Sequence, residues 1–227
     1  MKKFTIILVA ALMTVSSFSF AGGKKDGDKF AGTIKFKITT EGREVTPTEQ
    51  AQLPSESVWY YRDNMMRNDN VMPMVSVFTI VNLDSKETIL LLDQMGQKYK
   101  MNISGDDIKK LEEKNKDTTE AKPEYKLLDG TKTIAGYTCK KAEIISGDQK
   151  VEIYYTNDIK AEQKDFKDAP GYVMSYSVDI PNDELSLIYQ VSEVLTKKPK
   201  KSLFVASSDF EEMPDAYKTQ VKASMGL

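Results

Sequence analysis

The sequence predicts a mainly β protein with few helices, in which one curved antiparallel sheet forms an incomplete, half-open barrel closed by short helices. Three observations support this prediction. Short runs of alternating apolar and polar residues recur along the chain, turn residues separate them, and neither a fixed repeat nor a long linker interrupts them. The 227 residues suit a single all-β unit, so we expect one domain over residues 30–227.

The first half of the chain carries runs separated by tight turns. Residues 30–39 alternate strictly, which is typical of a strand with one buried and one wet face. Asp63-Asn64, Asp84-Ser85-Lys86 and Met95-Gly96 are turn sequences, so we expect their flanking strands to pair as antiparallel neighbours. The strands predicted here are 30–39, 57–62, 65–68, 74–83, 87–93 and 97–103.

The second half continues the pattern. Residues 172–180 and 185–192 alternate around Pro181-Asn182-Asp183 and form the clearest hairpin of the sequence. The segment 157–171 is polar and is either a loop or a short helix, and the loop at 41–56 can hold a helical turn. The other predicted strands are 125–129, 137–145, 151–156 and 202–208, and short helices are expected at 104–119 and 215–224.

The N-terminus has the composition of a secretory signal peptide. Lys2 and Lys3 precede an apolar run over residues 4–15, and Ser19-Phe20-Ala21 is a small-x-small cleavage site. We expect cleavage of residues 1–21 after Ala21, although an uncleaved anchor stays an alternative, and a flexible leader over 22–29. No cysteine lies near this site, so no lipid can be attached there. We therefore expect a soluble protein in the periplasm or outside the cell.

The composition excludes several classes of chemistry. The chain has no histidine and one cysteine, which removes Ser-His-Asp catalysis, His-liganded zinc and an intramolecular disulfide. Lysine and arginine (32) nearly balance aspartate and glutamate (34), which argues against a nucleic-acid binder. No P-loop, nucleophile elbow or dinucleotide fingerprint occurs. We expect no cofactor, no metal and no enzymatic activity.

The segment Thr131-Lys132-Thr133-Ile134-Ala135-Gly136-Tyr137-Thr138-Cys139-Lys140-Lys141-Ala142 resembles a family signature. It is similar to the T-x-x-I-x-G-Y-x-C-K-K-A block of an exported bacterial family of unknown function related to the GLPGLI proteins. The tail at 209–217 is also similar, although the family more often has glycine where Ala216 stands. The resemblance implies the fold of the LolA/LolB lipoprotein carriers, a half-open barrel with an apolar cleft for acyl chains. A fold hosts many functions, so it implies lipid carriage only by analogy.

Inside this block, Gly136 is expected to adopt a positive φ or to relieve a close approach. Tyr137 and Cys139 share one strand face, where Cys139 is interpreted as a packed small hydrophobe. A reactive or dimer-forming thiol stays an alternative.

Aromatic and methionine side chains are the candidate lining of an apolar cleft, because methionine is flexible and suits varied apolar ligands. The sequence leaves open which strand face carries the cleft, and an ordinary core is the alternative interpretation. The candidate ligand-binding residues are Phe36, Trp59, Tyr61, Met66, Met74, Phe78, Met101, Tyr176 and Tyr189.

Three functional hypotheses follow. The first is an exported binding protein for a lipid, an acyl chain or another hydrophobic ligand. The second is a protein-interaction module of the cell envelope, a stress sensor or assembly factor, with an exposed edge strand or apolar patch. The third is a hydrolase with close, buried carboxylates of raised pKa. The lysine-rich segment 197–201 could contact anionic head groups, although a solvated turn explains it as well.

Overall fold

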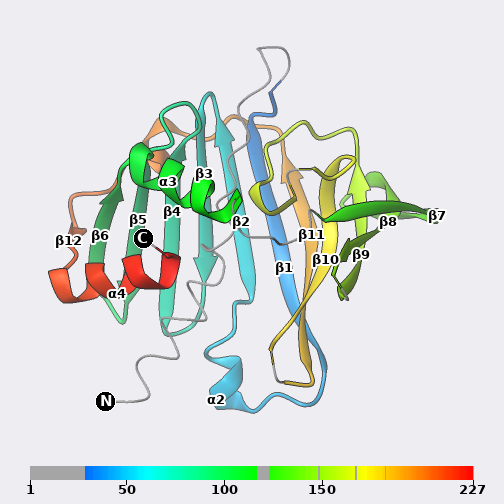
Figure 1. The fold of residues 1–227 in the computed structure, drawn as a ribbon, viewed down its shortest axis with the longest axis horizontal. Helices are drawn as coiled ribbons and strands as arrows, with labels where there is room; N and C mark the ends of the chain where they lie inside the picture. The colour runs from blue at the N-terminus through cyan, green and yellow to red at the C-terminus, as the bar shows by residue number, and fades with distance from the viewer. Residues whose placement is uncertain (1–28, 117–122, 148, 167, 182, 227) are drawn as a thin grey trace.

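The computed structural model describes residues 29–116, 123–147, 149–166, 168–181 and 183–226. In this part of the chain, twelve strands form one sheet in the order β12-β6-β5-β4-β3-β2-β1-β11-β10-β9-β8-β7 (Figure 1). The strands are β1 (Gly32–Gly42), β2 (Glu56–Arg62), β3 (Met65–Val71), β4 (Val75–Asn82), β5 (Thr88–Gln94), β6 (Gln97–Ile103), β7 (Glu124–Ile134), β8 (Tyr137–Ser146), β9 (Gln149–Thr156), β10 (Tyr172–Asp179), β11 (Leu185–Leu195) and β12 (Glu211–Glu212).

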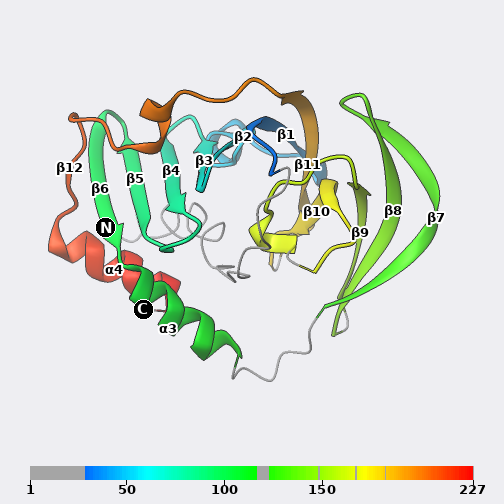
Figure 2. The ribbon, with the colours of Figure 1, turned by 90° about the horizontal axis from the view of Figure 1, so that it is seen from above.

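The sheet consists of two meanders joined at its centre. Strands β1 to β6 pair in chain order on one side, β7 to β11 on the other, and β1 pairs antiparallel with β11. The short β12 pairs parallel with β6. The sheet bends into an open arc seen from above in Figure 2, and its end strands β12 and β7 are not neighbours. The predicted open, curved, mainly β architecture is confirmed.

The concave face of the arc carries the largest apolar cluster. Because side chains alternate across a strand, each strand contributes every second residue to this face. On β1 these are Ile34, Phe36 and Ile38, and on β4 they include Val75 and Val77, all buried in one cluster.

Two helices lie on the concave side of the arc (Figure 2). Helix α3 (Gly105–Lys116) buries Ile108 and Leu111, and helix α4 (Asp215–Met225) buries Val221 and Met225 in the same cluster. Both helices were predicted. The loop after β1 holds the predicted helical turn, α2 (Pro47–Gln50), and the 157–171 segment holds the 3-10 helix η1 (Lys164–Phe166).

The convex face is covered by residues 196–210, which we call the strap. The strap leaves the end of β11, crosses the outside of the arc and reaches β12 (Figure 2). It contains the 3-10 helix η2 (Lys201–Phe204), whose Phe204 is buried against Ile80 and Leu91.

The predicted strand over 202–208 is therefore wrong. Backbone carbonyls of the strap accept hydrogen bonds from side chains of the sheet below, not from a neighbouring strand. Arg62 donates to the Pro199 carbonyl at 2.5 Å, and Arg67 donates to the Leu203 carbonyl at 2.7 Å. The apolar residues of this segment instead pack on the sheet from a tight helical turn.

Strand β7 is longer than predicted. A register shift between Leu128 and Thr131 marks a bulge, where Gly130 has a φ of 119°, and the strand continues beyond it to Ile134. Residues 130–134 were not part of the predicted strand. In the structure, Thr131 to Ile134 pair with β8, which turns back along them. The β7–β8 turn has positive φ at Ala135 (48°) and Gly136 (84°), so the expected positive φ of Gly136 is confirmed.

The predicted signal peptide at 1–21 and all of the predicted leader except Lys29 lie outside the described residues. Among the helices of the described part, none is long and apolar enough to cross a membrane.

Candidate functional site

The concave face of the sheet is the candidate site, and strand pairing fixes how its side chains lie side by side. One row across the sheet runs from Phe36 on β1 through Ser57, Asn70 and Val77 to Leu92 on β5. Residues that are directly paired lie on the same face, about 5 Å apart. The strand register therefore shows which side chains of the concave face are neighbours.

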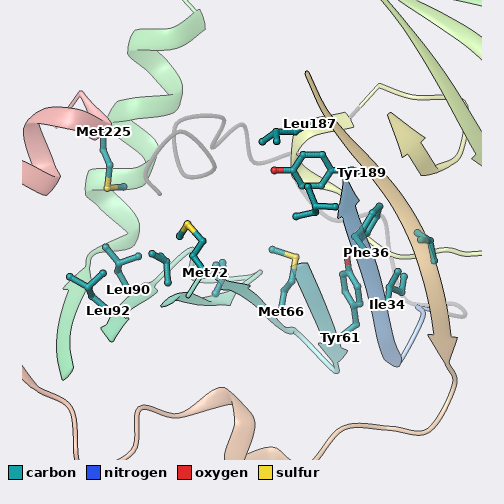
Figure 3. Close-up of a cluster of buried hydrophobic side chains, with 14 of the residues drawn as sticks. Ile34, Phe36, Tyr61, Met66, Met72, Leu90, Leu92, Leu187, Tyr189 and Met225 are labelled. Atoms are coloured by element: carbon teal, nitrogen blue, oxygen red, sulfur yellow. The ribbon is translucent and has the colours of Figure 1, made fainter. Parts of the chain in front are cut away.

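The concave face brings together most of the residues predicted to line a cleft. Phe36, Tyr61, Met66, Met101 and Tyr189 are buried in the concave cluster. Trp59 and Tyr176 are partly buried and pack against it. Figure 3 shows Met66 and Tyr189 projecting from different strands toward the same space. Their role in ligand binding stays a prediction.

Two predicted residues lie elsewhere. Phe78 points to the convex face, where its ring packs edge-on against Phe210 of the strap (6.4 Å between centroids) and lies 5.2 Å from the Arg67 guanidinium. Met74 lies in the turn between β3 and β4 and is exposed. Both are therefore removed from the concave set. Strand β4 has apolar residues at both parities because both of its faces are covered.

Aromatic rings gather on the β1, β2, β10 and β11 side of the concave face. Tyr176 and Tyr189 stack with their ring centroids 4.7 Å apart and 5° between their planes, and Phe166 meets Tyr176 edge-on at 4.8 Å. The hydroxyl oxygens of Tyr61 and Tyr172 lie 3.3 Å apart in the interior. Burial raises the pKa of Tyr189 to about 12 and that of Tyr61 well above its ordinary value, so both phenols stay neutral.

Flexible aliphatic and sulfur-containing side chains occupy the β3 to β6 side. Met66 and Met72 project from β3 and its end, with Leu90 and Leu92 of β5 beside them and Met225 of α4 opposite (Figure 3). Thioether side chains adapt to ligands of varied shape at little energetic cost. The concave face thus has an aromatic side and a deformable side.

Between these two sides lies a patch of buried polar residues that sequence reasoning missed. We call Ser57, Asn68, Asn70 and Thr79 the amide patch. Asn68 donates to the Ser57 hydroxyl at 2.9 Å, and Asn70 donates to the Asn68 side-chain carbonyl at 2.6 Å. The signal was available in parity, because residues 66, 68 and 70 alternate, but the predicted strand stopped at Asn68.

The single cysteine is fully buried. The Cys139 thiol donates to the Tyr137 carbonyl at 3.5 Å, and burial raises its pKa. A protonated, inaccessible thiol supports its interpretation as a packed hydrophobe. Within the described residues, no group of three or more acidic or cysteine side chains could hold a metal ion.

Asp69 is a carboxyl group whose burial raises its pKa. It lies on the convex side of β3 and forms an ion pair with Arg67, with 2.5 Å between Nε and Oδ1. Arg67 also holds the strap, so this pair belongs to the packing of the outer face.

Comparisons with known proteins give the following likenesses. Residues 108–173 match the family described as N-glycanase peptide, N-terminal domain, which is less than half of the chain. Among solved structures, PNGF-II aligns with a TM-score of 0.46 and 17% identity over 86% of this chain and 34% of that chain. This chain thus spans about a third of PNGF-II. No curated protein sequence matches it.

Two smaller proteins are also similar. A DUF1329 family protein from Desulfovibrio piger aligns with a TM-score of 0.35 and 11% identity, covering 91% of this chain and 98% of that one. A LolA superfamily protein from Nitrosomonas europaea aligns with a TM-score of 0.25 and 12% identity, covering 88% and 96%.

Proposed function

We propose that this chain is an exported, non-catalytic binding protein whose concave sheet face takes a lipid, an acyl chain or another hydrophobic ligand. The observation that carries the proposal is the composition of the concave cluster, which spans both meanders and combines tyrosine rings with flexible methionines. Helices α3 and α4 supply four buried apolar side chains, Ile108, Leu111, Val221 and Met225. The sheet supplies many more, including Ile34, Phe36, Tyr61, Met66, Val77, Leu90, Leu92, Met101, Tyr189 and Val191.

The chemistry of the lining supports a ligand with a flexible chain. Apolar surface removed from water contributes roughly 25 cal/mol per Å², so an acyl chain against this face would gain substantial affinity. Stacked tyrosines and methionines bind apolar groups without requiring one fixed shape. The open arc, whose end strands do not pair with each other, supports entry from the side of the sheet.

The compartment, the domain organisation and the relatives belong to the same proposal. We propose that residues 1–21 direct export and are removed, that 22–29 are a leader, and that 30–227 form one domain related to the exported family with the Thr131–Ala142 block. The sheet order supports a single unit, since β1 joins the two meanders. The mass of the protein recovered from the cell envelope tests cleavage after Ala21.

The binding proposal is tested with N-phenyl-1-naphthylamine, a neutral probe that fluoresces in apolar sites. Met66 and Met65 are adjacent residues on opposite faces of β3, Met66 in the concave cluster and Met65 beneath the strap. We expect saturable binding to the wild-type protein. We expect Met66→Gln to weaken binding by about tenfold, from the lost apolar contact, and Met65→Gln to leave it unchanged.

Circular dichroism verifies that both variants fold, and lipid extraction of the wild-type protein should recover an amphiphile. Absence of saturable probe binding to the folded wild-type protein would contradict the proposal. Equal loss in both variants would show that the concave face is not the site.

The alternative function is a protein-interaction module without a small ligand. One observation favours it: β7 ends the sheet, and Leu127 on this strand is 65% exposed. An edge strand offers backbone groups to a partner chain. Cross-linking from β7 in whole cells would distinguish this function, since a ligand carrier requires no partner there. The position of Asp69 under the strap does not favour a carboxylate-dependent hydrolase.

A further inference from the structure

The amide patch stands out because it interrupts an apolar face. Ser57, Asn68, Asn70 and Thr79 are all buried, at 3% to 9% of their full exposure. They come from three adjacent strands, β2, β3 and β4. Buried polar groups need hydrogen-bond partners, and four of them together replace apolar contact in the middle of the concave face.

The register shows that the patch is compact. Asn70 is paired directly with Ser57 across β2 and β3, and Asn68 is paired directly with Thr79 across β3 and β4. The two hydrogen bonds, Asn68 to Ser57 and Asn70 to Asn68, connect three of its members into one chain. Thr79 is the register partner of Asn68, the middle member of this chain.

Apolar side chains flank the patch on both sides. Phe36 is paired with Ser57 on the aromatic side, and Leu90 is paired with Thr79 on the deformable side. A ligand lying across the strands would therefore contact apolar, polar and again apolar surface. Carboxamide side chains both donate and accept hydrogen bonds, and the patch carries no charge.

We propose that the amide patch recognises a neutral polar linkage within the ligand, of the carboxamide class, placed between two apolar portions. This inference rests on the proposed function of the concave face. The ligand class it names is an amide-containing amphiphile such as an acylated amine, as opposed to a plain hydrocarbon or a free fatty acid. A carboxylate would be desolvated against uncharged groups with no described cation beside them, which is unfavourable.

The test uses competitors that differ only at the polar group. N-pentylhexanamide and dodecan-6-one have the same number of non-hydrogen atoms, and each carries its polar group between two apolar chains. The ketone replaces the amide N–H with a methylene group. Each displaces N-phenyl-1-naphthylamine from the wild-type protein. We expect N-pentylhexanamide to displace the probe at about fivefold lower concentration than dodecan-6-one, the effect of roughly one net hydrogen bond.

The variants assign this preference to the patch. Asn68→Leu and Thr79→Val should abolish this preference, so that amide and ketone displace the probe at about the same concentration, while probe binding persists. The matched control is Thr88→Val, because Thr88 is a buried threonine of the next strand, β5, whose hydroxyl donates to the Lys86 carbonyl at 3.2 Å. Thr88→Val should keep the wild-type preference. If Asn68→Leu fails to fold, Thr79→Val decides the result.

The outcomes separate this inference from the function on which it rests. Wild-type protein that binds the probe but treats amide and ketone alike overturns the inference and leaves the binding function intact. The assignment to the patch is overturned if the preference survives in both patch variants, or if Thr88→Val also abolishes it. The buried polar residues would then serve only to fix the register of the strands. Wild-type protein that binds no probe overturns the proposed function itself.

Discussion

Arg43 joins two carboxylates that are far apart in the sequence. Its guanidinium donates to both side-chain oxygens of Asp183, at 2.6 and 2.7 Å, and to Glu49 at 2.8 Å. Asp183 lies in the turn between β10 and β11, and Glu49 lies in α2, where it completes a capping box with Thr46. One side chain thus ties the end of β1 to a turn 140 residues away.

A pH dependence follows from Glu49. The hydrogen bond from Arg43 lowers the pKa of Glu49 to about 2, from an ordinary value near 4.5. A lowered pKa means that the native state favours the ionised form, so this stabilisation is full above about pH 4.5 and disappears as the pH falls through about 2. We expect Glu49→Gln to lower the free energy of unfolding at pH 7 by more than at pH 3.

Urea unfolding of wild-type and variant protein at the two pH values measures this difference. Thr46 can still cap a helix that has glutamine in place of Glu49, so the comparison isolates the charge. A difference that is independent of pH would contradict the assignment to the ion pair.

At the scale of elements, the β7–β8 hairpin illustrates how local geometry is encoded. Its turn residues Ala135 and Gly136 both have positive φ, at 48° and 84°. A two-residue hairpin turn with both residues in this region favours Asn-Gly or Gly-Gly, because the left-handed conformation is strained for alanine. The segment Thr131–Ala142 therefore places a well-suited residue, Gly136, and a strained residue, Ala135, in this turn.

Substitutions at the two positions should have opposite effects. We expect Ala135→Asn to stabilise the protein by about 0.5 kcal/mol, since asparagine tolerates the left-handed region. We expect Gly136→Ala to cost about 1 kcal/mol from backbone strain alone, because nothing lies within 4 Å of the added Cβ. Thermal unfolding monitored by circular dichroism gives both values, and shifts of the same sign would refute this description of the turn.

At the scale of the whole molecule, the sheet is an arc with other elements packed on each face and with its end strands apart. Helices α3 and α4 lie on the concave side and the strap lies on the convex side, while β1 at the centre is paired along both edges. Stability should therefore be greatest at β1 and lowest at the ends of the sheet.

Amide hydrogen exchange should reveal this gradient. We expect slow exchange throughout Ile34–Ile38 of β1, and in β7 protection only for the amides that bond to β8, with the outward-facing amides exchanging quickly. Mass spectrometry of peptic fragments measures both segments in one experiment. Uniform protection of β7 at the level of β1 would mean that another strand pairs with this edge, which would favour the interaction-module alternative.

The alternation of residues identified β1, β10 and β11, because each has one mostly apolar parity. The turns at 84–86 and 95–96 identified β5 and β6. The alternation rule failed on β4, where Phe78 and Val77 are both apolar and point to opposite faces. It also failed on the strap, whose apolar residues resemble those of a strand. In both cases a second covered face, which only the folded chain creates, supplied the apolar residues.

The sequence by itself determined the local elements of this protein: most strands, the tight turns and the two longer helices, since each depends on residues within a few positions of one another. The tertiary structure alone decided which face is concave, that the strap covers the convex face, and that Ser57, Asn68, Asn70 and Thr79 meet in one patch. These features depend on pairing across the sheet and on its curvature. Residues far apart in the chain, such as those of β1 and β11, set both, and periodicity along a single strand contains no information about them.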